Sequence, residues 1–197
     1  LNDSVPTANI STVTDLSLYG NDPNEGNFGI QDLTGIEDFT YLEYLQVSNN
    51  ELTFLDISQN QYLNQVRISG NQITEFIFSE NNGTYLEILY CNDNLLTNID
   101  LSVLPNLKIL YIRGNLLTEI DVSNNLALEE LLIEDNQLFE LDVSNNDVLD
   151  VLWCHQNELD CIQVGDVDYA NTMSTTLWSS GYYHFRKDSN AYYSLDC

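Results

Sequence analysis

The chain has 197 residues, of which 43% are hydrophobic, and this is enough for one continuous core. Its 31 Asp and Glu residues against 5 Lys and Arg residues give a formal net charge of -26, so the surface repels nucleic acid and anionic lipid. We therefore expect no nucleic-acid partner. No stretch approaches the roughly 18 consecutive apolar residues of a membrane span, so we expect no membrane insertion.

The first 41 residues contain an entry segment and a degenerate first copy of a repeat. This copy begins at Val13, and an insertion over residues 22–29 interrupts it. Within the insertion, Asp22-Pro23-Asn24-Glu25-Gly26 only weakly resembles a calcium-binding loop, and we interpret it as an exposed turn. The residues of this copy that match the later repeats are Val13, Leu16, Leu18, Asn21, Ile30, Leu33 and Ile36.

Residues 42–164 contain six clear copies of the pattern L-x-x-L-x-V/I/C-x-x-N-x-L/I-x-x-L/I/F, spaced by 21, 23, 21, 21 and 21 residues. In a segment such as residues 44–48, inward apolar and outward residues alternate, which predicts one short strand per copy. Because the copies repeat in register, we expect these strands to stack into one parallel sheet. The copies begin at Leu42, Leu63, Leu86, Leu107, Leu128 and Leu149.

Two sets of polar residues mark the bends between strands. The Asn that follows each strand is expected to be buried and to bond the unpaired backbone groups of the bend. The Asp on the opposite side predicts a tight turn, because Asp and Ser side chains bond nearby backbone amides, and its spacing lacks the dense acidic run of a calcium loop. These residues are Asn50, Asn71, Asn94, Asn115, Asn136 and Asn157, and Asp56, Asp100, Asp121 and Asp142.

Together these features predict a leucine-rich-repeat solenoid that forms a single domain over residues 1–197. A parallel β-sheet would form the concave face, and turns or short 3-10 segments would form the convex face, with few or no α-helices. Residues 1–41 would hold the entry segment and the first repeat, and residues 42–164 the six clear repeats. Residues 165–197, which break the period, would form a C-terminal cap over the open end of the core.

The four cysteines are expected to be of two kinds. Cys91 and Cys154 occupy the same repeat position three copies apart, so strands spaced by about 4.8 Å put them roughly 14 Å from each other, beyond disulfide reach. We expect them to be buried free thiols. Cys161 and Cys197 bracket the tail, where a disulfide would close a loop over the end of the solenoid and indicate an oxidising compartment. The tail residues that we expect to be solvated are His184, Arg186 and Lys187.

The outward side of the predicted sheet is the candidate ligand-binding surface, because solenoids use their sheet as an extended binding face. The middle outward column becomes aromatic and apolar toward the C-terminal half, and an exposed apolar area flanked by charges is typical of an interaction site. The bland alternative is that these aromatic residues only favour β structure. The predicted ligand-binding residues are Tyr44, Arg67, Tyr90, Tyr111, Arg113, Leu132, Glu134, Trp153 and His155.

No catalytic or metal-binding motif is recognisable in the sequence. Its two histidines, His155 and His184, lie in different contexts, and no nucleophile elbow, phosphate-binding loop or Cys-x-x-Cys is present. Glu130 and Glu134 could in principle cleave a glycosidic bond as a carboxylate pair, but acidic residues are so abundant that such a pair is expected by chance. We therefore expect no enzyme activity, no cofactor and no metal.

Three segments carry a resemblance to a known family: Thr7-Ala8-Asn9-Ile10-Ser11 at the entry, residues 32–39 in the first repeat, and residues 161–171 with Cys197 at the exit. They resemble the secreted leucine-rich-repeat proteins of marine and environmental Bacteroidetes, whose short 21-residue repeat is of the internalin-like type. The resemblance covers almost the whole chain. It implies secretion or attachment to the cell surface. Because family members place a helical cap before the entry segment, it also implies that the chain is part of a longer protein.

From these observations we expect an extracellular, monomeric binding module that recognises a protein or peptide through the concave face. Two alternatives remain open at this point. The same aromatic residues could stack on the sugar rings of a polysaccharide, or the solenoid could be a structural spacer or adhesin stalk that uses no face for binding.

Overall fold

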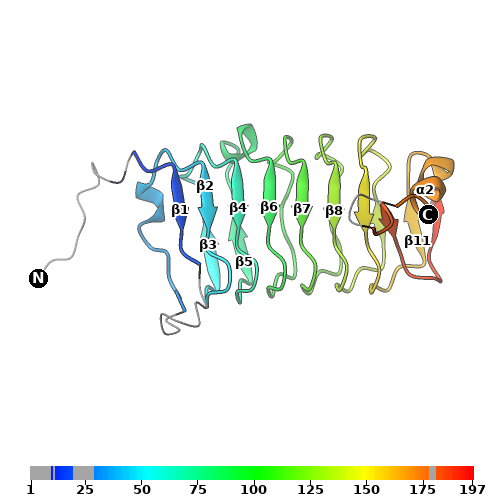
Figure 1. Ribbon diagram of the computed structural model, residues 1–197, viewed down its shortest axis with the longest axis horizontal. Helices are drawn as coiled ribbons and strands as arrows, with labels where there is room; N and C mark the ends of the chain where they lie inside the picture. The colour runs from blue at the N-terminus through cyan, green and yellow to red at the C-terminus, as the bar shows by residue number, and fades with distance from the viewer. Residues whose placement is uncertain (1–9, 11, 20–28, 178–180) are drawn as a thin grey trace, which may run out of the picture.

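The computed structural model describes residues 10, 12–19, 29–177 and 181–197. The chain winds into a row of stacked turns, with the first turns (blue) and the last turns (red) at opposite ends of the row (Figure 1). The predicted insertion, apart from Gly29, lies outside the described residues, as do most of the entry segment and Trp178. Within the described ranges, no helix has the length and hydropathy needed to cross a membrane.

One strand from each copy of the repeat joins a single parallel sheet, as predicted. The pairing aligns the inward residues of successive copies, for example Leu45 with Val66 and Leu89 with Leu110. These residues are fully buried and form the centre of the core. In spatial order the strands are β1 (Asp15–Ser17), β2 (Tyr44–Gln46), β4 (Gln65–Arg67), β6 (Ile88–Tyr90), β7 (Ile109–Tyr111), β8 (Glu130–Leu132), β10 (Val151–Trp153) and β12 (Phe185–Arg186).

Tight turns, two 3-10 helices, one α-helix and some short strands form the opposite side of the solenoid. The Asp that opens a turn accepts a hydrogen bond from the backbone two residues later, as from Ser58 N–H to Asp56 at 2.8 Å. The predicted turns and 3-10 segments are therefore confirmed, but the short strands were not predicted. These elements are η1 (Ile36–Asp38), η2 (Asn82–Thr84), α2 (Val167–Met173), the pair β3 (Phe54–Asp56) and β5 (Glu75–Ile77), and the parallel set β9 (Leu141–Asp142), β11 (Cys161–Gln163) and β13 (Tyr192–Ser194).

The Asn ladder predicted at the ends of the strands is present. Asn115 shows its chemistry, because its Nδ2 donates to the carbonyl oxygens of Cys91 at 3.1 Å, Ile112 at 3.0 Å and Arg113 at 3.2 Å. Its Oδ1 accepts a hydrogen bond from Leu96 N–H at 3.1 Å. One buried amide thus satisfies four backbone groups and joins two successive turns.

A second row of buried asparagines, which the sequence analysis missed, joins the turns on the other side. Asn125, for example, donates from Nδ2 to the carbonyl oxygens of Leu101 at 3.1 Å and Leu104 at 2.8 Å. The signal was available in the sequence, since these asparagines follow the turn-opening Asp by four residues where that Asp is present. Leu104 occupies this position in one turn and interrupts the row. The row consists of Asn60, Asn82, Asn125 and Asn146.

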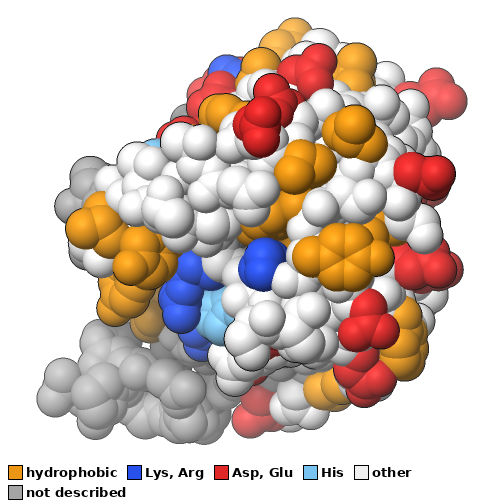
Figure 2. Space-filling view, turned by 90° about the vertical axis from the view of Figure 1, so that its right-hand side faces the viewer, with side chains coloured by type: hydrophobic (Ala, Val, Ile, Leu, Met, Phe, Trp, Pro, Cys, Tyr) orange, Lys and Arg blue, Asp and Glu red, His pale blue; other side chains and the backbone are white. Residues whose placement is uncertain are grey.

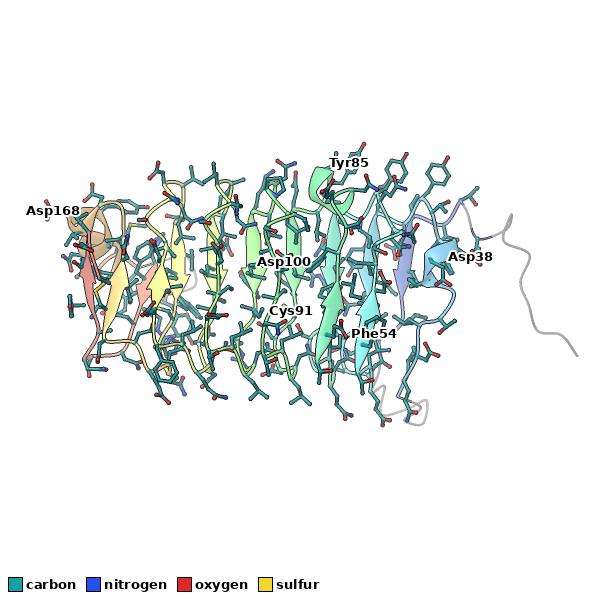
Figure 3. The ribbon with its side chains drawn as sticks, turned by 180° about the vertical axis from the view of Figure 1, so that it is seen from behind. Asp38, Phe54, Tyr85, Cys91, Asp100 and Asp168 are labelled. Carbon is teal, nitrogen blue, oxygen red and sulfur yellow. A yellow bond between two sulfur atoms is a disulfide. The ribbon has the colours of Figure 1, made fainter. Side chains whose placement is uncertain are left out.

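Cys91 and Cys154 are free, fully buried thiols, as predicted. They share the inward column that follows the central strand residues with Ile112 and Ile133, and Cys91 lies inside the solenoid in Figure 3. Burial raises the pKa of both thiols, so they stay protonated and act as small apolar side chains.

The tail, residues 165–197, continues both sides of the solenoid although its sequence breaks the period. Strand β12 pairs with β10, and β13 pairs with β11 on the opposite side. Phe185 and Tyr193 are buried against the end of the core. The predicted disulfide between Cys161 and Cys197 is present and ties the last residue of the tail to β11.

Candidate functional site

The open side of the eight-stranded sheet, called the sheet face below, carries the predicted ligand-binding residues. The strand register aligns the middle outward column as expected. The tail adds an unexpected eighth member, because Arg186 pairs with Trp153 through β12 and β10. From the N-terminal end, the aligned residues are Ser17, Gln46, Arg67, Tyr90, Tyr111, Leu132, Trp153 and Arg186.

Arg67, Tyr90 and Tyr111 form a stacked cluster in the middle of the sheet face, called the central cluster below. The Arg67 guanidinium lies 4.6 Å from the Tyr90 ring centroid. The Tyr90 and Tyr111 rings are stacked, with centroids 4.6 Å apart and planes inclined by 21°. All three side chains are half-buried. Because their neighbours in the column order them, these side chains lose little entropy when a partner binds.

Glu130, on the strand next to Tyr111, fixes the end of the central cluster. The Tyr111 hydroxyl donates a hydrogen bond to Glu130 Oε2. Burial, together with this hydrogen bond and the Glu130 charge, raises the pKa of Tyr111 well above its ordinary value. The Tyr111 hydroxyl therefore remains a hydrogen-bond donor at every physiological pH, and Glu130 is already occupied by it.

The tail covers the C-terminal part of the sheet face. Trp153 Nε1–H donates to the Tyr183 carbonyl at 2.9 Å, and the Tyr182 ring packs edge-on against Trp153 at 5.4 Å. The Arg186 guanidinium lies 4.9 Å from the Trp153 ring centroid. Figure 2, which looks onto the end that carries the tail, shows cationic and histidine side chains side by side next to hydrophobic ones. Trp153 is therefore half-buried by the chain itself.

The sequence analysis treated Leu132 and Glu134 as exposed, and this is wrong. Leu132 is 8% exposed and Glu134 only 4% exposed. Leu132 lies in the register between Tyr111 and Trp153, two large rings that enclose it. Glu134 has one carboxylate oxygen, Oε2, that is buried without a hydrogen-bond partner. Neither side chain offers surface to a ligand in this structure.

Burial raises the pKa of Glu134, and the nearby charges of Arg113 and Arg186 only partly oppose this effect. The folded state therefore holds the proton more tightly than the unfolded chain, so the carboxylate destabilises the fold as the pH rises above its pKa. We expect Glu134→Gln to raise the free energy of unfolding by about 1 kcal/mol at pH 7. Urea denaturation at pH 7 and pH 3.5 measures this gain.

At pH 3.5, below the ordinary Glu pKa of about 4.3, the carboxyl is largely neutral in both states and the gain should shrink toward zero. Glu158→Gln, an exposed residue in the next repeat, serves as the matched control and should change stability little at either pH. An equal gain at both pH values would contradict the assignment of the effect to the Glu134 charge.

The remaining predicted residues have different surroundings. Arg113 is exposed and lies 3.6 Å from Asp93 in an ion pair, so its guanidinium is accessible to a partner. Tyr44 lies toward the N-terminal end, where its hydroxyl donates to Gln46 Oε1 at 3.3 Å. His155 is half-buried, and burial lowers its pKa, which keeps the imidazole neutral near pH 7. Of the nine predicted residues, the structure brings Arg67, Tyr90 and Tyr111 into mutual contact.

Two tail residues that we expected to be solvated instead contact the end of the sheet. Arg186 stacks on Trp153, and the half-buried His184 lies with Nδ1 3.1 Å from the Asp150 carboxylate. The expectation failed because a residue outside the repeat period gives no sign of the strand that it will pair with.

A second aromatic row, which the sequence analysis missed, follows one edge of the sheet. Tyr41, Tyr62 and Tyr85 each precede the first Leu of a copy, and neighbouring rings lie 5.4 Å apart. They are 54%, 40% and 46% exposed. Figure 3 shows Tyr85 projecting from this edge. The shared repeat position was the signal that could have revealed this row, called the tyrosine edge below.

Among the described residues, no group of three or more His, Cys, Asp or Glu side chains is arranged to hold a metal ion. Glu130 and Glu134, the carboxylates considered for glycoside hydrolysis, are respectively bonded to Tyr111 and buried. The chemistry that the sheet face offers is therefore that of recognition, through stacked rings, a guanidinium group and hydroxyl donors.

Comparison with known proteins assigns the fold. No protein-family model and no curated protein matches the sequence. Among solved structures, the functional domain of InlJ from Listeria monocytogenes matches 96% of the chain with 28% identity and a TM-score of 0.72, and its description notes a cysteine ladder. The fold is a leucine-rich-repeat solenoid.

Two further structures agree with this assignment. A leucine-rich-repeat protein from Leptospira interrogans matches 84% of the chain with 20% identity and a TM-score of 0.66. YopM, a leucine-rich effector protein from Yersinia pestis, matches 63% with 26% identity and a TM-score of 0.57. The match covers 42%, 42% and 35% of these three proteins in turn, so the chain corresponds to less than half of each.

Proposed function

We propose that this chain is an extracellular binding module that captures a protein or peptide through the sheet face. The observation that carries the proposal is the central cluster, in which Arg67, Tyr90 and Tyr111 are aligned, ordered and half-exposed. Arg and Tyr are the residue types enriched among the energetic hot spots of protein interfaces. The exposed guanidinium of Arg113, one column away, can in addition bind a carboxylate of the partner.

The geometry of the central cluster favours a protein over a polysaccharide. A sugar ring stacks on an open aromatic face, but Tyr90 has Arg67 packed against it from one neighbouring strand and Tyr111 from the other. The cluster therefore presents ring edges, hydroxyl groups and a guanidinium to solvent. Such a surface suits the mixed apolar and polar contacts of a protein interface.

The extracellular part of the proposal rests on the Cys161–Cys197 disulfide and on the similarity to leucine-rich-repeat proteins such as the InlJ domain. Disulfides persist in oxidising compartments and are rare in the cytosol of most organisms. The structural similarity to an effector protein also agrees with a role in interaction.

The test is to isolate a partner by affinity capture and to measure its affinity for variants of the full chain. Tyr90→Ala with Tyr111→Ala should weaken binding by at least about 30-fold, because loss of a hot-spot cluster costs about 2 kcal/mol or more. The matched control is Tyr62→Ala with Tyr85→Ala on the tyrosine edge, which removes two equally large rings and should leave the affinity unchanged.

Thermal melting of each variant separates lost binding from lost folding. Unchanged affinity after the Tyr90 and Tyr111 substitutions would sink the proposal. A strong hit on a glycan array that depends on the same two residues would instead favour carbohydrate recognition. Indifference of every isolated partner to all sheet-face substitutions would favour a spacer or stalk.

A further inference from the structure

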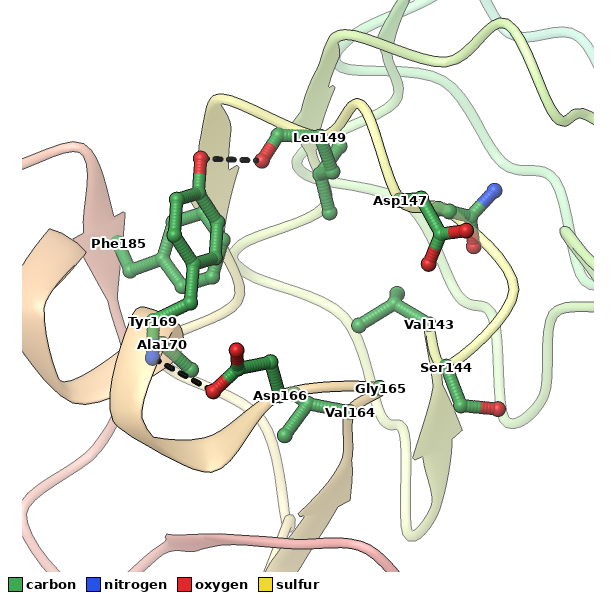
Figure 4. A pocket seen from close by; sticks show the side chains of 11 residues that line it. Val143, Ser144, Asp147, Leu149, Val164, Gly165, Asp166, Tyr169, Ala170 and Phe185 are labelled. Carbon is green, nitrogen blue, oxygen red and sulfur yellow. Dashed lines mark hydrogen bonds between the residues drawn. The ribbon is translucent and has the colours of Figure 1, made fainter.

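A cavity of about 320 Å³ lies between the last regular turn of the solenoid and the tail, away from the central cluster. We call it the tail cavity. Figure 4 shows Tyr169 and Phe185 on one side and Asp147, Val143 and Ser144 on the other. The cavity exists because the chain leaves the repeat after Val164 and enters helix α2, so the turn that would continue the stack is missing. Its volume is at the lower end of the range found for small-molecule sites.

The inner walls of the tail cavity are apolar. Val143, Val164, Ala170 and Phe185 line it, and each is at most 5% exposed. The Tyr169 ring packs edge-on against Phe185 at 6.0 Å, and its hydroxyl donates to the Leu149 carbonyl at 3.3 Å. The walls therefore suit a hydrocarbon stem of a ligand and are held in place by contacts within the protein.

The polar groups of the tail cavity are acceptors. Asn146 lines it and is 4% exposed, and its Nδ2 is used by the carbonyl oxygens of Val122 and Asn125. Its Oδ1 is buried and has no hydrogen-bond partner. Buried acceptors without partners are uncommon and costly, so this oxygen is available to a donor in a ligand. Asn60 and Asn125 have the same unpartnered oxygen, but neither lines a comparable space.

Charge decides which donor fits. Asp147 and Asp166 also line the tail cavity, and both are exposed. None of the eleven described residues that line it is Lys or Arg. A neutral donor would satisfy Asn146 but would gain nothing from the two carboxylates, whereas a cation gains from all three groups.

We infer that the tail cavity binds an ammonium or guanidinium group carried on a short apolar stem. The stem would lie against Val143, Val164 and Phe185, and the cationic head would lie near Asp147, Asp166 and the Asn146 oxygen. This chemistry is shared by a free alkylamine and by a Lys or Arg side chain of a partner protein. The inference concerns a site separate from the sheet face and does not depend on the proposed function.

The test is a titration of the ¹⁵N-labelled full chain, followed by two-dimensional NMR, with n-pentylamine and with its uncharged analogue n-pentanol. Pentylamine should shift the amide signals of Gly165 and Ala170 in a saturable manner, and pentanol should bind at least about tenfold more weakly. Asp147→Asn with Asp166→Asn should weaken pentylamine binding by about tenfold, since two partly solvated charges are lost. Asn at position 166 preserves the hydrogen bond from Tyr169 N–H.

Asp168→Asn, on the same helix but outside the cavity lining, is the matched control and should bind pentylamine as the unmodified chain does. Ala170→Leu, which fills the space, should abolish the shifts while a thermal melt verifies folding. N-acetyl-lysine methylamide tests the source of the cation: binding as tight as that of pentylamine supports a side chain of a partner, and much weaker binding supports a free amine. Absence of saturable shifts, or equal binding of pentanol and pentylamine, would overturn the inference.

Discussion

Replacing Asn115 by Ala is expected to lower the free energy of unfolding by at least about 3 kcal/mol, because each buried backbone group left without a partner costs about 1–3 kcal/mol. The Asn115 amide serves four such groups, the carbonyl oxygens of Cys91, Ile112 and Arg113 and the N–H of Leu96. The bend lies at the edge of a dry core, where water reaches these groups poorly. Urea denaturation followed by far-UV circular dichroism measures the loss.

Two further variants test the hydrogen-bonding explanation. Asn115→Asp keeps the shape but replaces the donor by an acceptor that faces three carbonyl oxygens, so it should be at least as destabilising as Ala at pH 7. Asn124→Ala, at an exposed position in the next turn, should change stability by less than about 0.5 kcal/mol. A loss below 1 kcal/mol for Asn115→Ala would contradict the structural role of the ladder.

Replacing Cys161 and Cys197 by Ser is expected to lower the free energy of unfolding by about 4 kcal/mol, the chain-entropy value for a loop of this length. The disulfide closes a loop with a sequence separation of 36 and holds the end of the tail to β11. Without it, the short pairings of β12 and β13 must hold the tail by themselves. We expect the loss to fall mainly on the tail.

Hydrogen exchange of the unmodified and the Ser-substituted chains tests where the loss falls. The amides of Tyr193 and Ser194 should exchange much faster in the variant, while that of Leu110, at the centre of the stack, should change far less. A reducing agent added to the unmodified chain should reproduce the effect, and it should have no effect on the Ser variant. A loss spread evenly over all turns, or one below 1 kcal/mol, would contradict this assignment.

The repeat explains why so much of the fold could be predicted from the sequence. Apolar residues that recur every 21 residues, such as Leu45 and Val66, can all be buried only if successive turns stack in register. The register then places residues of equal repeat position in one column, so the alignment of Arg67, Tyr90 and Tyr111 was predictable before any coordinates. The fully buried Cys91 and Cys154 follow from the same rule.

Periodicity does not extend to the tail, and the errors arose there. Leu132 and Glu134 stand at outward positions, but neighbouring large rings and the tail bury them. The pairing of β12 with β10 has no signal in the repeat pattern, because Phe185 lies 33 residues from its partner Leu152, as the residue numbers show.

The sequence by itself thus determined the parallel stack, the columns of the sheet face and the ladders of asparagine, because each depends only on which residues recur at a fixed spacing. The tertiary structure alone decided which part of the sheet face stays open, that Tyr90 and Tyr111 stack on each other, and that a cavity remains where the stack ends. These features depend on how side chains from the tail and from adjacent turns fill space, and that contact is not encoded in any local pattern.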